Sequence, residues 1–280
     1  MKCDGTLAVA PLTDLSDAGL AAAIEADQIH TRVRSPEVPV EVHDDPDATW
    51  GIARYPDPYR SVVVSARFPA PSADRRIREI AATFAAHGTG FLWWVSPFHS
   101  PPDLGGRLVN AGLRYEGKAP AMAVDLDTLP RGEAPPPGLQ IVPVRDASTL
   151  AQFIDVLAGE MGLPPGEPNP AARHHEALLR TVPSTLASEA VPLRYLGLLD
   201  GRPVATSRVA IASGAAGLYA VATLPDVRRR GFGRAMTLAA MHAGRSLGMR
   251  IGVLQASDEG MPVYRRLGFR TMFDYDVYMG

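Results

Sequence analysis

Cysteine and lysine are nearly absent from this sequence. Cys3 is the only cysteine, which excludes an internal disulfide framework and a thiolate metal cluster. Lys2 and Lys118 are the only lysines, and arginine supplies the other basic side chains, as high-GC coding bias would produce. No stretch approaches the apolar length that spans a bilayer, and residues 1–5 lack the charged-then-apolar pattern of a secretory signal. We therefore expect a cytoplasmic protein that does not enter a membrane.

Strong net charge is missing as well. The formal net charge is −2 at pH 7, which gives no reason to expect nucleic acid as a partner. An apolar content of 46% over 280 residues describes a globular chain, long enough for one large domain or two smaller ones. Residues 1–135 carry 13 basic and 18 acidic side chains, whereas residues 136–280 carry 15 and 12. The second half is therefore the one that favours an anionic ligand.

A predicted strand, a glycine-bearing turn and a predicted helix follow one another in this second half. The apolar run 218–224 is typical of a strand and residues 235–247 of a helix, and Gly231 and Gly233 stand between them. The first N–H groups of a helix have no partner within it and carry partial positive charge. Glycine lets a ligand approach the backbone closely. This arrangement predicts a site for a phosphate or pyrophosphate group.

Two familiar glycine loops do not fit these residues. The dinucleotide fingerprint G-x-G-x-x-G would need a third glycine where Met236 stands, and the nucleotide-triphosphate loop needs a lysine that is absent. What remains is R-x-x-G-x-G, formed by Arg228, Gly231 and Gly233. This pattern resembles the pyrophosphate loop of the GNAT superfamily of N-acetyltransferases. An ordinary basic helix start is the alternative interpretation, and the residues that follow decide between the two.

A second motif lies near the end of the chain. The segment 264–269, Tyr-Arg-Arg-Leu-Gly-Phe, resembles the Y-x-x-x-G-F segment between the last helix and last strand of GNAT proteins, and Gly268 suits a left-handed helix end. Periodicity predicts an element order of β-α-α-β-β-β-α-β-α-β, which is that of the GNAT fold. The strands are expected at 139–144, 193–199, 203–211, 218–224, 250–256 and 270–279. The helices are expected at 148–161, 235–247 and 260–267, with one more that follows a loop at 162–170 and ends at about 180.

The resemblance implies a site for acetyl-CoA as the acetyl donor, between two strands that splay apart. Val221, Ala222 and Thr223 would offer backbone groups to the pantetheine amides. Arg228 would open the pyrophosphate loop. Ser257 stands where many GNAT proteins place an asparagine that steadies the cofactor, so here the sequence departs from the pattern. The backbone N–H groups of six residues would hold the pyrophosphate: Arg229, Arg230, Gly231, Phe232, Gly233 and Arg234.

The reaction that the resemblance implies is direct attack of an amine on the thioester. Tyr264 maps to the acid that protonates the departing thiolate, because a tyrosine normally holds its proton at neutral pH. An aromatic ring packed beside the cofactor is the alternative role. Four residues can serve as the base, directly or through water, and the sequence does not choose between them. These are Glu160, His174, His175 and Glu176. His-His-Glu is rejected as a metal site because adjacent histidines on a helix point about 100° apart.

A proline-rich linker at residues 129–138 divides the chain into an N-terminal half, 1–128, and a C-terminal half, 139–280. In the N-terminal half, residues 103–113 echo the short helix, glycine and closing strand of residues 261–269, so we expect a second, degenerate GNAT-like domain. Its elements are predicted as a helix from Thr13–Asp14 or Ser16 to about 29, helices at 72–87 and 102–111, and strands at 50–54, 61–68, 91–95 and 121–126.

The N-terminal half is not expected to bind coenzyme A. Residues 69–77 occupy the place of the phosphate loop without a glycine, and Leu104 or Arg107 falls near the place of the tyrosine. This half would be structural or would wall the acceptor pocket, with Trp93, Trp94 and His99 lining it, unless the tryptophans fill the core.

The sequence thus predicts an α+β protein with two GNAT folds in tandem, each a mostly antiparallel twisted sheet flanked by helices. Its expected activity is acetyl transfer from acetyl-CoA to a primary amine of a small molecule or peptide, as a monomer or homodimer, without a metal. A non-catalytic acyl-CoA-binding or sensing protein on the same fold is the alternative.

Overall fold

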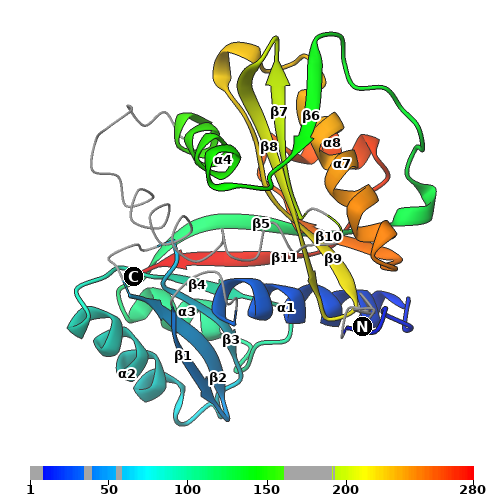
Figure 1. Cartoon of the computed structure of the whole chain (residues 1–280). Coiled ribbons are helices and arrows are strands. Elements are labelled where there is room, and N and C mark those ends of the chain that lie inside the picture. The colour runs from blue at the N-terminus through cyan, green and yellow to red at the C-terminus, as the bar shows by residue number, and fades with distance from the viewer. Residues whose placement is uncertain (1–8, 35–39, 55–58, 161–190, 192) are drawn as a thin grey trace, which may run out of the picture.

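The structure is a computed structural model, and it describes residues 9–34, 40–54, 59–160, 191 and 193–280 (Figure 1). The N-terminal half forms β1 (Val40–Asp45), β2 (Ala48–Ala53), β3 (Val62–Ala66), β4 (Leu92–Val95), β5 (Arg114–Asp125), α1 (Asp17–Val33), α2 (Ala73–Ala86) and α3 (Leu104–Asn110), and ends in the short helix η1 (Leu126–Thr128). The C-terminal half forms β6 (Leu139–Pro143), β7 (Arg194–Leu199), β8 (Arg202–Ala212), β9 (Ala215–Thr223), β10 (Ile251–Gln255), β11 (Arg270–Met279), α4 (Ala147–Glu160), α7 (Phe232–Ser246), α8 (Met261–Arg266) and the short helix η2 (Pro225–Val227).

One sheet runs through both halves, in the order β1-β2-β3-β4-β11-β5-β10-β9-β8-β7-β6. The closing strands are exchanged. β11 pairs with β4 of the N-terminal half, and β5 pairs with β10 of the C-terminal half. β5 and β11 also pair with each other, antiparallel, and cross the middle of the molecule side by side (Figure 1). The mixed sheet flanked by helices confirms the α+β prediction, but the two expected sheets are joined into one.

Within the described residues most elements lie where the sequence predicts them, and two strands differ, whereas the helix predicted to end near residue 180 lies outside the described residues. β1 was not predicted because its Val-Glu-Val-His-Asp-Asp sequence is polar and mostly solvent-facing. β5 begins seven residues before the predicted strand at 121. Residues 114–119 are exposed or half-buried and include Gly117, and the buried Pro120 follows them, so the apolar run that signals a strand starts late. Ser16, one of the two predicted caps, accepts a hydrogen bond from the N–H of Gly19 and starts α1.

Alternating side chains divide the sheet into two covered faces. Trp93 of β4 points into the core under α2 and α3, whereas Trp94 points to the opposite face, where α1 lies. In the C-terminal half, Val209 and Leu218 pack under α7. The other face of β8 and β9 carries α4 and part of α1. One face of the sheet is therefore covered by α2, α3, α7 and α8, and the other face by α1 and α4.

α1 is the helix that joins the halves. It contacts β3 of the N-terminal half, β8 and β9 of the C-terminal half, and the exchanged strands β5 and β11. Ile24 is completely buried in the cluster between α1 and these strands. Because α1 crosses from one half to the other, residues of the N-terminal half reach the face of β9.

Candidate active site

β9 and β10 are neighbours in the sheet but pair only near their beginnings. Parallel pairs join Ala216 with Gly252 and Gly217 with Val253, and none follows, although β9 continues to Thr223. The two strands therefore separate after Gly217. This is the splayed gap that the resemblance implies, and it lies directly before the glycine loop.

A β-bulge turns β9 where the gap opens. Ala220 has a φ of +51°, and the register against β8 shifts at this position. Thr206 of β8 holds the bulge by donating its hydroxyl hydrogen to the carbonyl oxygen of Ala220 at 2.8 Å. The three residues expected to meet pantetheine follow the bulge as the last residues of β9: Val221, Ala222 and Thr223.

The glycine loop ends at the N-terminus of α7. Arg229 and Gly231 both have left-handed backbones, with φ of +66° and +83°, and Gly231 is the residue that precedes the helix. Phe232 is buried and anchors the first turn of α7, while the guanidinium of Arg230 lies 5.1 Å from its ring centroid. Successive N–H groups next to left-handed residues form a concave anion site, and the helix dipole adds to it.

Arg228, at the start of the loop, is paired with two carboxylates. Arg228 donates to the carbonyl oxygen of Thr223 at 3.2 Å and pairs with Glu160 at 3.0 Å and Glu259 at 3.3 Å. Glu160, one of the four candidate bases, therefore lies at the phosphate loop. The other three candidates, His174, His175 and Glu176, lie outside the described residues.

The linker packs against the loop. Both carboxylate oxygens of Glu133 accept hydrogen bonds from Arg234, at 3.0 and 2.6 Å. A Cβ added to Gly231 would lie 3.4 Å from Pro136. His242 of α7 contacts the carbonyl oxygen of Pro130 at 2.9 Å, so the linker runs beside α7 (Figure 1). An incoming phosphate would therefore meet a carboxylate that already occupies Arg234.

Tyr264 lies under α7 on the same face of the sheet. Its ring is nine-tenths buried, against Phe269 and close to Gly260. Burial raises the pKa of its phenol to about 12, so the hydroxyl keeps its proton at neutral pH. Among the described residues the hydroxyl has no hydrogen-bond partner. Ser257 accepts a hydrogen bond from the N–H of Gly260 at 3.2 Å and so shapes the turn that leads into α8.

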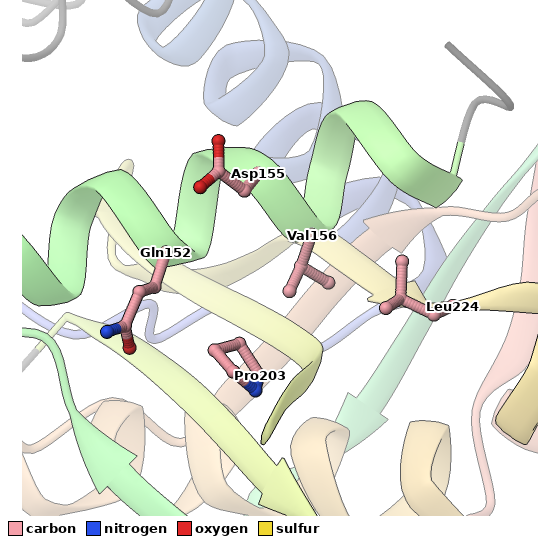
Figure 2. Close-up of a pocket in the computed structure, with 5 residues that line it drawn as sticks. All are labelled: Gln152, Asp155, Val156, Pro203 and Leu224. Carbon is pink, nitrogen blue, oxygen red and sulfur yellow. The ribbon is translucent and has the colours of Figure 1, made fainter. Parts of the chain in front are cut away.

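A hollow of about 230 Å³ lies on the α4 side, where β9 ends. Figure 2 shows Val156 of α4 and Leu224 facing it above Pro203, whereas the carboxylate of Asp155 points away from the sheet. The hollow is too small for a whole coenzyme A.

The matching gap of the N-terminal half is closed by its own backbone. Phe68 donates to the carbonyl oxygen of Ser100 at 3.0 Å, and Ser100 donates to that of Ala66 at 3.2 Å. The loop after β4 is thereby bonded to the end of β3, in the place where β9 and β10 are apart.

The place of the phosphate loop in this half holds ion pairs. Arg76 pairs with Asp45 and Asp47, each at 2.8 Å, and Arg107 pairs with Asp74 and Asp103. Leu104, at the expected place of the tyrosine, is fully buried. Trp93 also fills the core, and His99 contacts the carbonyl oxygen of Ser96. No part of this arrangement resembles an anion site.

A group of buried polar residues that the sequence analysis missed lies between α1 and β9. Asp27 of α1 is fully buried, and Tyr219 of β9 donates its hydroxyl hydrogen to Oδ2 of this carboxylate. Burial raises the pKa of Asp27 to about 7, against the hydrogen bond from Tyr219 and the charges of Arg208 and Arg32. We call the group the inter-half polar cluster, and its members are Asp27, Thr31, Arg32, Arg208, Tyr219 and Tyr275.

The described residues hold no group of three or more His, Cys, Asp or Glu side chains placed to share a metal ion. Within the same ranges, no helix combines the length and the apolar character needed to cross a membrane.

Comparison with known proteins supports the resemblance. Residues 194–271 match the family model of the acetyltransferase (GNAT) domain. No curated protein matches the chain. Among solved structures, a GCN5-related N-acetyltransferase from Kribbella flavida is 21% identical with a TM-score of 0.68, over 93% of this chain and 95% of that one. A second, from Sphaerobacter thermophilus, is 16% identical with a TM-score of 0.61, over 84% and 80%.

A tandem GNAT protein from the clavulanic acid biosynthesis pathway is 14% identical with a TM-score of 0.53, and 97% of each chain is covered. At these identities the likeness establishes the fold. The chain therefore has the GNAT fold, and residues 194–271 match the acetyltransferase (GNAT) domain.

Proposed function

We propose that this chain is an acyltransferase that moves the acetyl group of acetyl-CoA directly onto a primary amine. The observation that carries the proposal is the gap between β9 and β10, which opens between the glycine loop of α7 and the phenol of Tyr264. The family match supports it, because residues 194–271 span β7 to the start of β11 and so include the gap and the loop.

The residues at the gap fit acetyl-CoA, which would supply an acetyl group activated as a thioester. The pyrophosphate would lie against the N–H groups at the start of α7. There Arg228 and Arg234 would exchange their carboxylate partners for phosphate oxygens. Ser257 would lie beyond the end of β10, and the pantetheine amides would pair with the free edge of β9 at Val221, Ala222 and Thr223.

Tyr264 would act as the acid of the reaction. Its phenol is protonated, lies on the α7 face of the gap and has no hydrogen-bond partner in the described part of the chain. A hydroxyl in this position can donate a proton to the sulfur as the carbon–sulfur bond breaks.

For the N-terminal half we propose a role without coenzyme A. Its gap is closed and its arginines are paired, so one donor site per chain is expected. Residues 1–128 and 139–280 would be the two GNAT-like units in sequence, with 129–138 as the linker that packs on α7.

The proposal is tested by the release of coenzyme A from acetyl-CoA in the presence of a panel of primary amines. We expect release that depends on the amine, with the acetylated amine as the second product. Tight acetyl-CoA binding without release for any amine would instead support the binding or sensing role. Failure to bind acetyl-CoA at all would contradict both.

A further inference from the structure

The inter-half polar cluster lies directly over the point where β9 and β10 separate. A Cβ added to Gly217, the last paired residue of β9, would lie 2.6 and 2.7 Å from the two carboxylate oxygens of Asp27. Gly217 thus leaves room for a carboxylate that comes from the other half of the chain. Tyr264 lies on the α7 face, whereas Asp27 reaches the sheet from the α1 face. The two groups therefore approach the same gap from opposite sides.

The cluster contains buried polar atoms that have no partner within the described part of the chain. Among those residues, Oδ1 of Asp27, the hydroxyl of Tyr275 and Nε of Arg32 make no hydrogen bond. Unpaired buried polar atoms are costly and few in native structures, and a catalytic role or a bound molecule is one explanation for them. A polar ligand between α1 and β9 would satisfy this set.

Glu25, two positions before Asp27 on α1, is a buried carboxylate with both oxygens paired, as expected for a structural role. Its two oxygens accept hydrogen bonds from Arg67 at 2.5 Å and Ser96 at 2.6 Å. Asp27 is buried more deeply, and within the described residues its Oδ2 accepts a hydrogen bond from Tyr219 while its Oδ1 accepts none. A carboxylate of this kind attracts a cation, and an ammonium ion from a substrate fits the position.

Arg32 supplies the opposite charge at the same site. Its guanidinium lies 4.3 Å from the ring centroid of Trp94, and no carboxylate or other hydrogen-bond acceptor among the described residues contacts it. Burial lowers its pKa only to about 10, so it stays charged at neutral pH. A charged guanidinium without an acceptor is a site for a carboxylate.

Burial along β9 decreases beside the cluster. Residues 215–218 are buried, whereas Tyr219, Ala220 and Val221 are half-buried. Tyr219, which donates its hydroxyl hydrogen to the fully buried Asp27, therefore lies at the start of the half-buried part of β9, at the bulge where the thioester of a bound donor would arrive.

We propose that the acceptor is an amino carboxylate, such as an α-amino acid, bound between α1 and β9, with Asp27 as the general base for its amine and Arg32 as the partner of its carboxylate. The inference rests on the proposed acetyl transfer. The N-terminal half then supplies the acceptor chemistry and the C-terminal half supplies the donor site. Tyr219 is a positioning residue that holds Asp27 through its hydrogen bond.

Each proton that moves in the proposed acetyl transfer has a donor and an acceptor. Asp27 takes one proton from the ammonium, and the freed nitrogen lone pair forms the bond to the carbonyl carbon. When the carbon–sulfur bond breaks, its electron pair goes to the sulfur, which receives the proton of Tyr264. The nitrogen returns a second proton to Tyr264, and Asp27 later releases its proton to water. The products are the amide, the thiol and one solvated proton.

The pKa of Asp27 as the base depends on all the groups of the inter-half polar cluster. The charged and titratable groups that face Asp27 are Arg32 from α1, Arg208 from β8, Tyr219 from β9 and Tyr275 from β11, and Glu25 of α1 acts on Tyr275. A base of this kind should give a kcat that rises as Asp27 loses its proton.

Matched substrates and variants test the proposal. Coenzyme A release is measured with phenylalanine and with phenethylamine, which lacks only the carboxylate, and the same comparison is made for other such pairs. We expect higher kcat/KM for the amino acid and loss of this preference in Arg32→Met. Asp27→Asn should lower kcat by about a hundredfold or more and abolish the pH-dependent rise, while the acetyl-CoA affinity is unchanged. Asp17→Asn, on the exposed start of α1, and Arg34→Met are the controls.

The outcomes separate this inference from the acetyl transfer it rests on. If the wild-type chain acetylates amines but Asp27→Asn keeps its rate and pH profile, or if simple amines are preferred, the inference is wrong and the acetyl transfer stands. If no amine is acetylated, calorimetric titration of the chain with the amino acids decides. Binding that is lost in Asp27→Asn and Arg32→Met supports the site, and absence of binding overturns it.

Discussion

At the scale of single residues, the proton of Tyr264 is the feature on which the proposed chemistry depends. Tyr264→Phe removes the hydroxyl and leaves the buried ring, which packs on Phe269. We expect kcat to fall about a hundredfold and the dissociation constant of acetyl-CoA to stay the same, because an acid acts on the leaving sulfur and not on binding. Tyr115→Phe, at an exposed phenol on β5, is the matched control. Full turnover in Tyr264→Phe would leave Tyr264 only as a packing residue.

Asp27 makes the free energy of unfolding depend on pH. Its pKa is about 7 in the folded chain and near 3.8 when exposed, so between these values the folded state holds a proton that the unfolded state has lost. Stability should therefore fall as pH rises from about 4 to about 7, by at most about 1.4 kcal/mol per pH unit, and then level off. Asp27→Asn should lack this part of the slope.

The measurement is denaturant unfolding of both proteins from pH 4 to pH 8, with the difference between them plotted against pH. Other titrating groups contribute to both proteins and cancel. A difference that does not change with pH would mean that Asp27 is ionised throughout the range and is paired in a way that the structure does not show.

At the scale of elements, the loop before α7 is restrained by the linker. Glu133 occupies Arg234 with two hydrogen bonds, and both side chains are partly exposed. Glu133→Gln should tighten acetyl-CoA binding about two- to fivefold, because the phosphate no longer displaces a carboxylate and a surface ion pair is worth at most about 1 kcal/mol. Titration calorimetry measures the change.

Glu79→Gln is the control for this prediction, since Glu79 pairs with Arg75 and Arg76 on α2, in the half without a donor site. Weaker acetyl-CoA binding in Glu133→Gln would show that the linker carboxylate orients Arg234 for the phosphate and does not compete with it.

Elements with a strong local signal could be predicted from the sequence. The loop around Gly231 and the helix after it follow from glycine positions and helical periodicity, and the motif around Tyr264 is identified by its resemblance to a GNAT segment. β1 could not, because its apolar alternation is limited to Val40 and Val42 and its other four residues are polar. The burial of Asp27 could not be predicted either, because an aspartate on an amphipathic helix is expected to face solvent. Its partner Tyr219 is 192 positions away, and only the fold brings them together.

At the scale of the whole molecule, the exchange of closing strands ties the halves together. β5 and β11 are similar antiparallel strands, and periodicity cannot say which half each one joins. The exchange makes the sheet continuous and lays α1 across both halves. The linker at 129–138 therefore separates two halves of the sequence whose strands lie in one continuous sheet.

This exchange predicts that residues 139–280 do not form a folded monomer alone. Without β5, the edge of β10 is exposed, and β11 lacks both of its neighbours. We expect the fragment to aggregate or associate on size-exclusion chromatography, and co-expression with residues 1–138 to restore a soluble complex. A monomeric fragment with cooperative unfolding would show that β11 can fold back onto its own half.

Titration of the intact chain with acetyl-CoA tests the central assignment most directly. The open gap beside β9 and the closed gap beside β3 predict one site per chain. Gly231→Glu should lose this site, because it places a side chain on a left-handed backbone and a negative charge where the pyrophosphate would lie. Two sites per chain would contradict the closed N-terminal gap. Absence of binding by a wild-type chain that is folded would contradict the donor site itself.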